Sequence, residues 1–203
     1  MNRPKRIYPV ILSVQRQVQG LTGKERVRKL GYWARCALLE SARLSDVTLT
    51  RIEKNESGAP TPLEGIYWSL SHKKTYVCAV VSHEPIGIDL EELRPRPDSL
   101  FLRITDVDEQ RLSSEDRKIL FFRYWTSKEA ILKAEGDGLK GLSRCKIEEI
   151  LDPCHLTARY SGKRWHIEHH YFNGHIASIV RNHAQVEWTL YDELPVDGNS
   201  LGL

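Results

Sequence analysis

The sequence predicts an α+β protein built of two similar α/β halves. Runs of strands accompanied by a few helices occur twice along the chain, and the proline-rich segment 93–98 separates the two series. The length of 203 residues exceeds one usual compact domain and falls short of two large ones. We therefore expect an N-terminal half over 1–93, a linker over 94–99 and a C-terminal half over 100–203.

The N-terminal half opens with an apolar run at 7–14 that predicts a strand. Thr22 is suited to cap a helix that extends to about Ala42, because apolar residues recur there at helical spacing. The segment 55–62 is rich in Gly and Pro and predicts a loop. The other strands expected in this half cover residues 47–52, 66–70, 76–82 and 86–90.

The C-terminal half begins with helical stretches, a short one at 100–105 and a long one from Ser114 to Ala134. Ser114 can cap the long helix, and the glycine-rich segment 135–138 ends it. Strand patterns then continue to the C-terminal region. The expected strands cover residues 146–151, 156–160, 164–171, 175–180 and 186–191.

Composition excludes a membrane-spanning protein, because no apolar run approaches the roughly 18 residues that a spanning helix needs. The N-terminal apolar run has no small-residue cleavage site, so we expect no signal peptide and a cytoplasmic protein. Four cysteines lie far apart in the sequence and form no C-x-x-C pair. This pattern favours reduced thiols over a disulfide framework or a zinc site.

Positive charge is concentrated at the start of the chain. Residues 1–30 hold eight basic side chains and one acidic side chain, a net +7, whereas the whole chain carries +3 and the remainder therefore −4. Such a segment indicates either an anionic partner or a solvated helix face. A binder of nucleic acid is one reading, but aromatic residues are not interleaved with the basic ones, and we expect no nucleic-acid partner.

Two acidic residues end the apolar run at 86–90. Side chains alternate along a strand, so Asp89 and Glu91 point to one face while Ile88 and Leu90 point to the other. Two carboxylates this close repel each other unless a cation lies nearby. A solvated strand end is the simpler interpretation of this pair taken alone.

A third acidic residue lies on the long helix. Phe122, Trp125 and Glu129 share one helical face by three- and four-residue spacing, so Glu129 lies beside aromatic side chains that we expect to be buried. A carboxylate near a core needs a hydrogen bond, an ion pair or a metal ion. Lys133 is four residues further on, and a pair with Glu129 is the simpler explanation.

Three converging carboxylates would suit Mg²⁺, which prefers oxygen ligands and often completes its coordination with substrate phosphates. Three carboxylates and one Mg²⁺ leave about −1, so a polyphosphate substrate would need positive side chains around its outer phosphates. The candidates for this role are Lys128, Lys133, His72, Arg28 and Arg35.

Three segments together resemble the 4′-phosphopantetheinyl transferase superfamily. The segments are Gly87–Glu91 (GIDLE), Trp125–Leu139 (WTSKEAILKAEGDGL), which begins after 33 intervening residues, and Trp68–His72 (WSLSH). The last resembles a motif of the Sfp-type branch, and the chain length also resembles that branch. The resemblance implies two α+β halves in a pseudo-twofold arrangement, an active site between them, and a protein that works as a monomer.

The resemblance also implies roles for individual residues. Mg²⁺ would be held by Asp89, Glu91 and Glu129, and Glu129 would also act as the general base. Lys133 would contact the pyrophosphate of coenzyme A. Other phosphate contacts of coenzyme A would come from Arg35, Ser71, His72 and Lys128.

The implied reaction transfers phosphopantetheine from coenzyme A to a serine of an apo acyl or peptidyl carrier protein and releases 3′,5′-ADP. Family members often have Gly-Lys-Pro where this chain has Gly58-Ala59-Pro60, so one phosphate-binding lysine is absent. The alternative is a catalytically silent module that binds coenzyme A or a carrier protein.

Histidines gather in the C-terminal strands without a spacing typical of zinc. Strand alternation sends His169 and His170 to opposite faces. We therefore expect no metal site among the histidines at 166, 169, 170 and 175.

Overall fold

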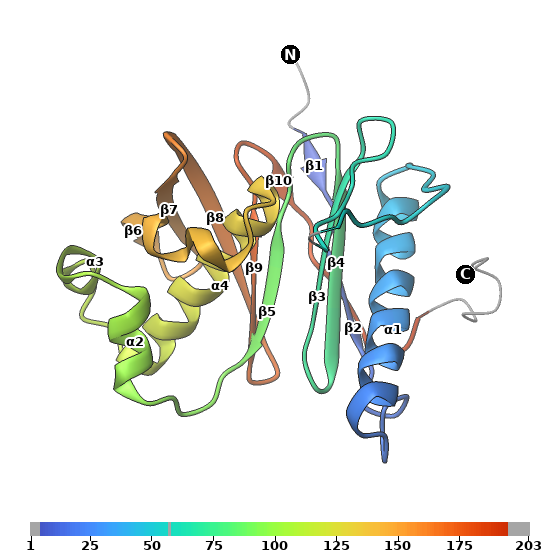
Figure 1. Ribbon diagram of the computed structural model, residues 1–203, viewed down its shortest axis with the longest axis horizontal. Coiled ribbons are helices and arrows are strands. Elements are labelled where there is room, and N and C mark those ends of the chain that lie inside the picture. The colour runs from blue at the N-terminus through green and yellow to red at the C-terminus, as the bar shows by residue number, and fades with distance from the viewer. Residues whose placement is uncertain (1–4, 57, 195–203) are drawn as a thin grey trace. The chain divides into compact units, whose positions relative to one another are not determined.

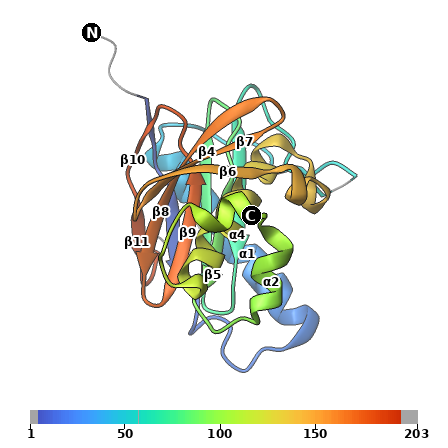
Figure 2. The same ribbon diagram turned by 90° about the vertical axis from the view of Figure 1, so that its left-hand side faces the viewer.

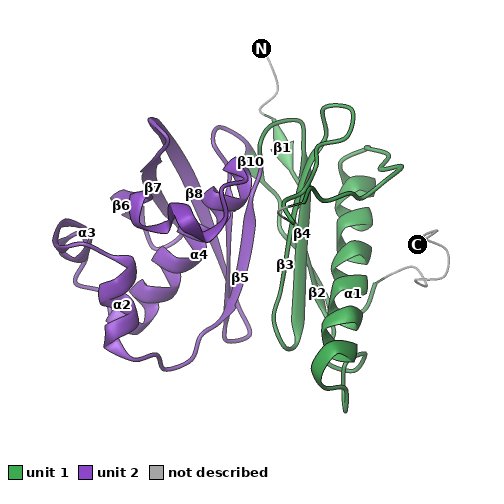
Figure 3. Cartoon of the chain, viewed as in Figure 1, with its two compact units in different colours: residues 1–85, 185–203 green, residues 86–184 purple. Residues whose placement is uncertain are grey.

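The computed structural model describes residues 5–56 and 58–194 of the chain. These residues fold as two compact units (Figures 1 and 3). Of the described residues, unit 1 comprises 5–56, 58–85 and 185–194, and unit 2 comprises 86–184. Helices and antiparallel strands occur in both units, so the α+β class is confirmed.

Unit 1 consists of one long helix and two sheets, one of four strands and one of two. Its elements are β1 (Arg6–Ile7), β2 (Val10–Ser13), α1 (Gly23–Leu44), β3 (Tyr67–His72), β4 (Tyr76–Ser82), β10 (Gln185–Val186) and β11 (Thr189–Tyr191). The four-stranded sheet has the order β11-β2-β4-β3, and β1 pairs with β10. β10 and β11 run parallel to their partners β1 and β2, so the end of the described chain completes both sheets.

The core of unit 1 lies between α1 and one face of the four-stranded sheet. Alternate residues of the strands, such as Val10 and Leu12 on β2, meet Leu30, Ala34 and Leu38 of the helix. The apolar residues of α1 recur at three- and four-residue spacing, which explains why the segment is helical. Thr22 is the N-cap residue, as predicted, although its side chain makes no capping hydrogen bond.

Unit 2 consists of a five-stranded antiparallel sheet and a set of helices, of which α4 is the longest. Its elements are β5 (Ile88–Glu92), α2 (Asp98–Ile104), α3 (Val107–Arg111), α4 (Arg117–Glu135), the 3₁₀ helix η1 (Gly138–Arg144), β6 (Lys146–Asp152), β7 (His155–Tyr160), β8 (Lys163–Phe172) and β9 (His175–Val180). The strand order is β5-β9-β8-β7-β6.

The long helix α4 is buried on nearly all sides. It packs on β5 and β9 of the sheet and also contacts α2 and η1 (Figures 1 and 2). Asp116 caps its start by accepting a hydrogen bond from the Lys118 backbone N–H at 2.8 Å. Gly136 ends it in the left-handed conformation with φ of 79°, as the glycine-rich segment 135–138 predicts.

The structure corrects several expected elements. No strand forms at 47–52; Val47, Leu49 and Ile52 are instead partly buried against the core of unit 1 without strand pairing. The long helix is capped by Asp116 and not by Ser114. Helix α3 was not predicted, because it is only five residues long.

The structure also describes the cysteines and the character of the helices. Cys36, Cys78 and Cys145 are buried free thiols, and Cys154 is an exposed one. None of the helices that the structure describes has the length and apolar character needed to cross a membrane.

The two units have different bounds from the expected division at residues 94–99. β5 pairs with β9, so Asp89 and Glu91 belong to unit 2 with the long helix. The segment 185–191 pairs with β1 and β2 and therefore belongs to unit 1. Both differences from the expected bounds arise because these strands pair with segments that are distant in the sequence.

Candidate active site

Strand β5 carries two buried carboxylates on one face. Asp89 is 5% exposed and Glu91 is 6% exposed. Ile88 and Leu90, which alternate with them, are fully buried on the opposite face. The sequence-based expectation that the two acidic residues share a face is thus met by the strand conformation of residues 88–92.

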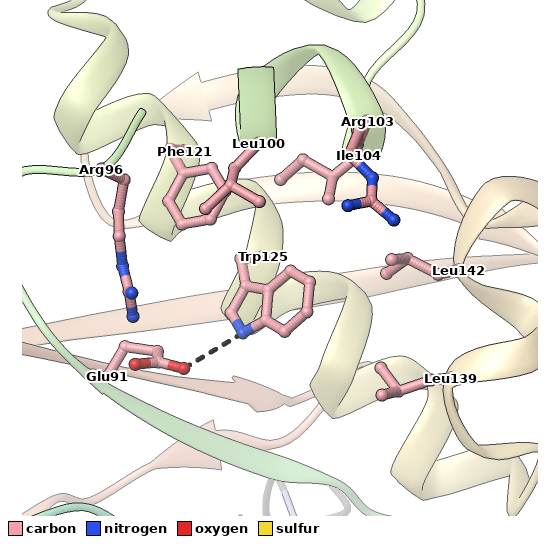
Figure 4. A pocket seen from close by; sticks show the side chains of 9 residues that line it. All are labelled: Glu91, Arg96, Leu100, Arg103, Ile104, Phe121, Trp125, Leu139 and Leu142. Atoms are coloured by element: carbon pink, nitrogen blue, oxygen red, sulfur yellow. Dashed lines mark hydrogen bonds between the residues drawn. The ribbon is translucent and has the colours of Figure 1, made fainter. Parts of the chain in front are cut away.

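Helix α4 contacts both carboxylates. The indole Nε1 of Trp125 donates a hydrogen bond to Glu91 Oε1 at 3.1 Å (Figure 4). The ammonium Nζ of Lys133 donates to Asp89 Oδ1 at 2.7 Å and to the Ile88 carbonyl at 3.0 Å. Lys133 therefore contacts Asp89 across the helix–strand interface.

Glu129 lies between these two contacts on the helix. It is four residues from Trp125 and four from Lys133, so all three side chains share one helical face. This face is the less buried one: all three side chains are partly exposed, whereas Lys128 and Ala130 are buried. The arrangement places the Glu129 position over the strand segment that carries Asp89 and Glu91.

The close approach of α4 to β5 requires a glycine at position 87. A Cβ atom on Gly87 would lie 1.8 Å from the Ala130 carbonyl oxygen and 2.9 Å from the Ala134 backbone nitrogen. Both are backbone atoms, so no side-chain rotation relieves the clash. The φ angle of Gly87 is not positive, and the requirement is therefore one of space.

Gly87→Ala is expected to destabilise the protein by about 1–3 kcal/mol, because the added methyl group pushes α4 away from β5. The midpoint of urea unfolding measures this effect. Gly31→Ala is the matched control, since Gly31 is helical and its added Cβ finds open space apart from one Arg35 atom at 4.0 Å; this variant is expected to be neutral or slightly stabilising. Equal midpoints for the two variants would contradict the packing argument.

Lys128 has a different place from the one expected of a phosphate-binding residue. Its side chain is 0% exposed, its Nζ lies 2.6 Å from Glu109 Oε1, and it donates to the Ile104 carbonyl at 2.5 Å. Burial lowers the pKa of Lys128, and the Glu109 carboxylate opposes that shift. Because the ammonium is enclosed by α2 and α3 residues, we leave Lys128 out of the candidate site.

A pocket of about 400 Å³ borders the site within unit 2. Trp125 and Glu91 form one wall, and Figure 4 shows Arg96 extended toward the carboxylate of Glu91. Most of the other walls are apolar. The remaining lining residues are Leu100, Arg103, Ile104, Phe121, Leu139 and Leu142.

The other predicted residues belong to unit 1. His72 ends β3 on the same face as Trp68, which packs in the core beneath α1, and the neighbouring Ser71 points to the opposite face. Arg35 is an exposed residue of α1. The structure thus brings Asp89, Glu91 and Lys133 together with the helical face that carries Glu129, all within unit 2. Arg35, Ser71 and His72 belong to unit 1 and are not part of this group.

The carboxylate oxygens of the candidate site are of the kind that Mg²⁺ prefers as ligands. Mg²⁺ prefers oxygen ligands and commonly takes one or two carboxylates together with water and substrate phosphates. β5 presents two carboxylates on one face, and Glu129 lies on the helix that packs on this strand. Within residues 5–56 and 58–194, no three His, Cys, Asp or Glu side chains form a ready metal cluster.

Comparison with known proteins identifies the superfamily of this segment. The family model described as the 4′-phosphopantetheinyl transferase superfamily matches residues 85–180, which contain β5, α4 and all the other strands of unit 2. Residues 85–180 thus match this superfamily, and the resemblance carried by Gly87–Glu91 and Trp125–Leu139 is confirmed.

Individual relatives agree with this assignment. The chain is 41% identical over 108 residues to the 4′-phosphopantetheinyl transferase HetI of Nostoc sp., an alignment that covers 50% of this chain and 45% of the relative. It is 35% identical over 98 residues to the 4′-phosphopantetheinyl transferase psf-1 of Bacillus pumilus, covering 45% of this chain and 42% of the relative.

A longer alignment reaches a Haemophilus influenzae protein named as a putative 4′-phosphopantetheinyl transferase. It is 28% identical over 152 residues and covers 70% of this chain and 63% of that protein. The chain therefore matches less than two thirds of the length of each of these three relatives.

Proposed function

We propose that this protein is a 4′-phosphopantetheinyl transferase. It would transfer the phosphopantetheine arm of coenzyme A to a serine of an apo acyl or peptidyl carrier protein and release 3′,5′-ADP. The observation that carries the proposal is the contact of α4 with β5 inside the matched segment, where Trp125 and Lys133 hold Glu91 and Asp89 on either side of Glu129.

The proposed metal ligands are Asp89, Glu91 and Glu129. Their support is the shared face of β5, the burial of the first two carboxylates and the position of the third on the helix that covers them. Bound there, Mg²⁺ would offset the charge that grows on the departing 3′,5′-ADP.

Two residues of α4 would act on the reacting groups. Glu129 would accept the proton of the carrier serine hydroxyl as that oxygen attacks phosphorus. Lys133 would contact the pyrophosphate and stabilise the leaving group by charge-assisted hydrogen bonding. Its ammonium lies 2.7 Å from Asp89 Oδ1, so a phosphate bound beside that carboxylate would be within its reach.

Arg35, Ser71 and His72 would bind the outer phosphates of coenzyme A. All three belong to unit 1, so the proposed activity needs both units. We further propose that the units are related halves in a pseudo-twofold arrangement. In support, each unit packs one long helix, α1 or α4, on a sheet made mostly of antiparallel strands. The proposed enzyme is a cytoplasmic monomer that needs neither nucleic acid nor membrane.

The test is a transfer assay with the full chain. The protein is incubated with coenzyme A, Mg²⁺ and several apo carrier proteins, and each carrier is weighed by intact mass spectrometry. We expect the mass of the phosphopantetheine arm to be added, and chelation of Mg²⁺ to abolish the addition. A folded protein that modifies none of the carriers would refute the proposal.

A silent binding module is the second candidate, and Ala59 favours it. Gly58-Ala59-Pro60 lacks the lysine that members of the family often place there, so one phosphate contact is missing. Isothermal titration of the protein with coenzyme A separates the two candidates. Binding of coenzyme A without transfer to any carrier would favour the silent module.

A further inference from the structure

A row of polar residues crosses the sheet of unit 2 beneath α4. Asp89 on β5 is the register partner of Ser178 on β9, and Ser178 is the register partner of His169 on β8. Register partners in an antiparallel sheet present their side chains on the same face, so the three side chains form one line across three strands. All are buried, at 5%, 0% and 3% exposure.

Such a row is costly in a core unless its hydrogen bonds are satisfied. Ser178 Oγ lies 2.8 Å from His169 Nδ1 and 2.5 Å from Thr126 Oγ1 of α4. Thr126 Oγ1 in turn donates to the Phe122 carbonyl at 2.7 Å. A continuous chain of hydrogen bonds therefore links His169 on the sheet to α4, one residue from Trp125.

The donors of this chain can be assigned in order. The one hydroxyl proton of Thr126 is used on the Phe122 carbonyl, so Ser178 must donate to Thr126. The proton of Ser178 is then used as well, and His169 must donate from Nδ1 to Ser178. The imidazole is thus the tautomer that carries its proton on Nδ1.

The other ring nitrogen agrees with this tautomer. His169 Nε2 is buried and has no hydrogen-bond partner among the residues that the structure describes. A buried N–H without an acceptor is rarer in proteins than an acceptor without a donor. A bare lone pair at Nε2 is therefore the favoured state. Burial also lowers the pKa of His169 well below its ordinary value, which keeps the ring neutral at pH 7.

We propose that His169 is a positioning residue of the transferase site. Its Nδ1–H orients the hydroxyl of Ser178, and Ser178 in turn donates to Thr126 of α4. This chain of hydrogen bonds fixes how closely α4 packs on β9, the neighbour of β5, and thereby where Glu129 lies relative to Asp89 and Glu91. The inference rests on the proposed function for its catalytic readout, but the tautomer and the metal affinity can be measured without transfer activity.

The tautomer is tested first, on the full-length protein without added metal. Two-dimensional NMR of ¹⁵N-labelled histidine at pH 7 distinguishes a protonated Nδ1 from a protonated Nε2, and His169→Asn assigns the signal. We expect Nδ1–H. An Nε2–H signal would reverse the direction of the hydrogen bonds and overturn the proposal.

Substitutions then test the positioning role. His169→Leu and Ser178→Ala break the chain, whereas His169→Asn keeps an N–H donor near the Nδ1 position. In the two broken variants we expect kcat for transfer to fall about tenfold, the size of one buried hydrogen bond. KM for coenzyme A should stay within about twofold, because none of these residues is expected to touch the substrate. His169→Asn should recover most of the lost rate.

Metal binding gives the readout that is independent of transfer. Mn²⁺ replaces Mg²⁺ as an electron paramagnetic resonance probe, and its affinity should weaken about tenfold or more in His169→Leu but not in His169→Asn. His170→Asn is the matched control, because His170 lies on the opposite face of β8. Wild-type kcat and Mn²⁺ affinity in His169→Leu would overturn the positioning role.

The outcomes separate this proposal from the proposed function. Failure of the wild-type protein to modify any carrier would count against the transferase, while a Mn²⁺ affinity that depends on the His169 donor would still support the positioning role. Transfer by the wild-type protein together with unaffected His169→Leu and Ser178→Ala variants would leave the transferase standing and exclude the positioning role.

A pH dependence of stability follows from the same residue. The unfolded chain takes up a proton at His169 near pH ~6.5, whereas the folded protein does not until a lower pH. The unfolded state therefore binds more protons as the pH falls below that value, and the contribution of His169 to stability is lost. Between pH 7 and 5 the free energy of unfolding should fall less steeply in His169→Asn than in the wild-type protein. The charged groups that act on the pKa of the ring are Arg123, His155 and Asp152, and all three remain in the variant.

Discussion

Glu129→Gln is expected to slow phosphopantetheine transfer by on the order of 10²–10³-fold while the fold remains intact. The substitution keeps the volume of the side chain but removes both the proposed proton acceptor and one of the proposed Mg²⁺ ligands. Single-turnover transfer to an apo carrier, followed by intact mass spectrometry, measures the rate. Circular dichroism and the urea midpoint verify that the variant is folded.

Glu135→Gln is the matched control for this substitution. Glu135 is the last residue of the same helix and makes an ion pair with Lys163 at 2.8 Å on the surface. Its loss should change transfer less than about twofold, because exposed ion pairs contribute little. If Glu129→Gln kept more than a tenth of the wild-type rate, Glu129 would have neither proposed role.

Lys128→Met is expected to lower the free energy of unfolding by about 3–5 kcal/mol, because it leaves Glu109 buried without its cation. Glu109 Oε1 would keep only the hydrogen bond from the Ile147 backbone N–H at 2.8 Å. The double variant Lys128→Met with Glu109→Gln should recover part of the loss, since no charge is then left unpaired. Urea unfolding of the three variants measures the effect.

Lys118→Met is the control, because Lys118 is an exposed residue of the same helix and should change stability by less than about 0.5 kcal/mol. Titration with coenzyme A then decides the role of Lys128. The folded Lys128→Met variant should bind coenzyme A as the wild-type protein does. A large loss of affinity with unchanged stability would restore Lys128 as a phosphate contact.

Much of the fold follows from patterns in the sequence. The apolar runs at 76–82 and 175–180 coincide with β4 and β9, and Gly136 ends α4 as expected. The segment at 47–52 shows why apolar content can mislead: its apolar residues pack against the core of unit 1 without pairing as a strand. Which strands pair could not be predicted, because register depends on backbone hydrogen bonds between distant segments.

Some features of the candidate site could likewise be predicted from the sequence, and others could not. Alternation placed Asp89 and Glu91 together, and helical spacing placed Glu129 with Trp125. Lys128 lies on another side of α4 than Glu129, because adjacent helical residues point in directions about 100° apart, and its ammonium pairs with Glu109. Trp125 was expected to be buried, but it is partly exposed and its N–H donates to Glu91. The polar row through Ser178 needed the sheet register, which no local pattern contains.

The discontinuity of unit 1 has a consequence for synthesis on the ribosome. β10 and β11 belong to the sheets of unit 1 but are made about 100 residues after β4, once the whole of unit 2 has been translated. Domains generally fold in order from the N-terminus as they emerge. Here we expect the reverse order, because unit 2 is contiguous from 86 to 184, whereas the sheets of unit 1 are complete only once residues 185–191 have been made. A chain that ended before residue 185 would thus contain the strand face with Asp89 and Glu91, but its unit 1 would lack β10 and β11.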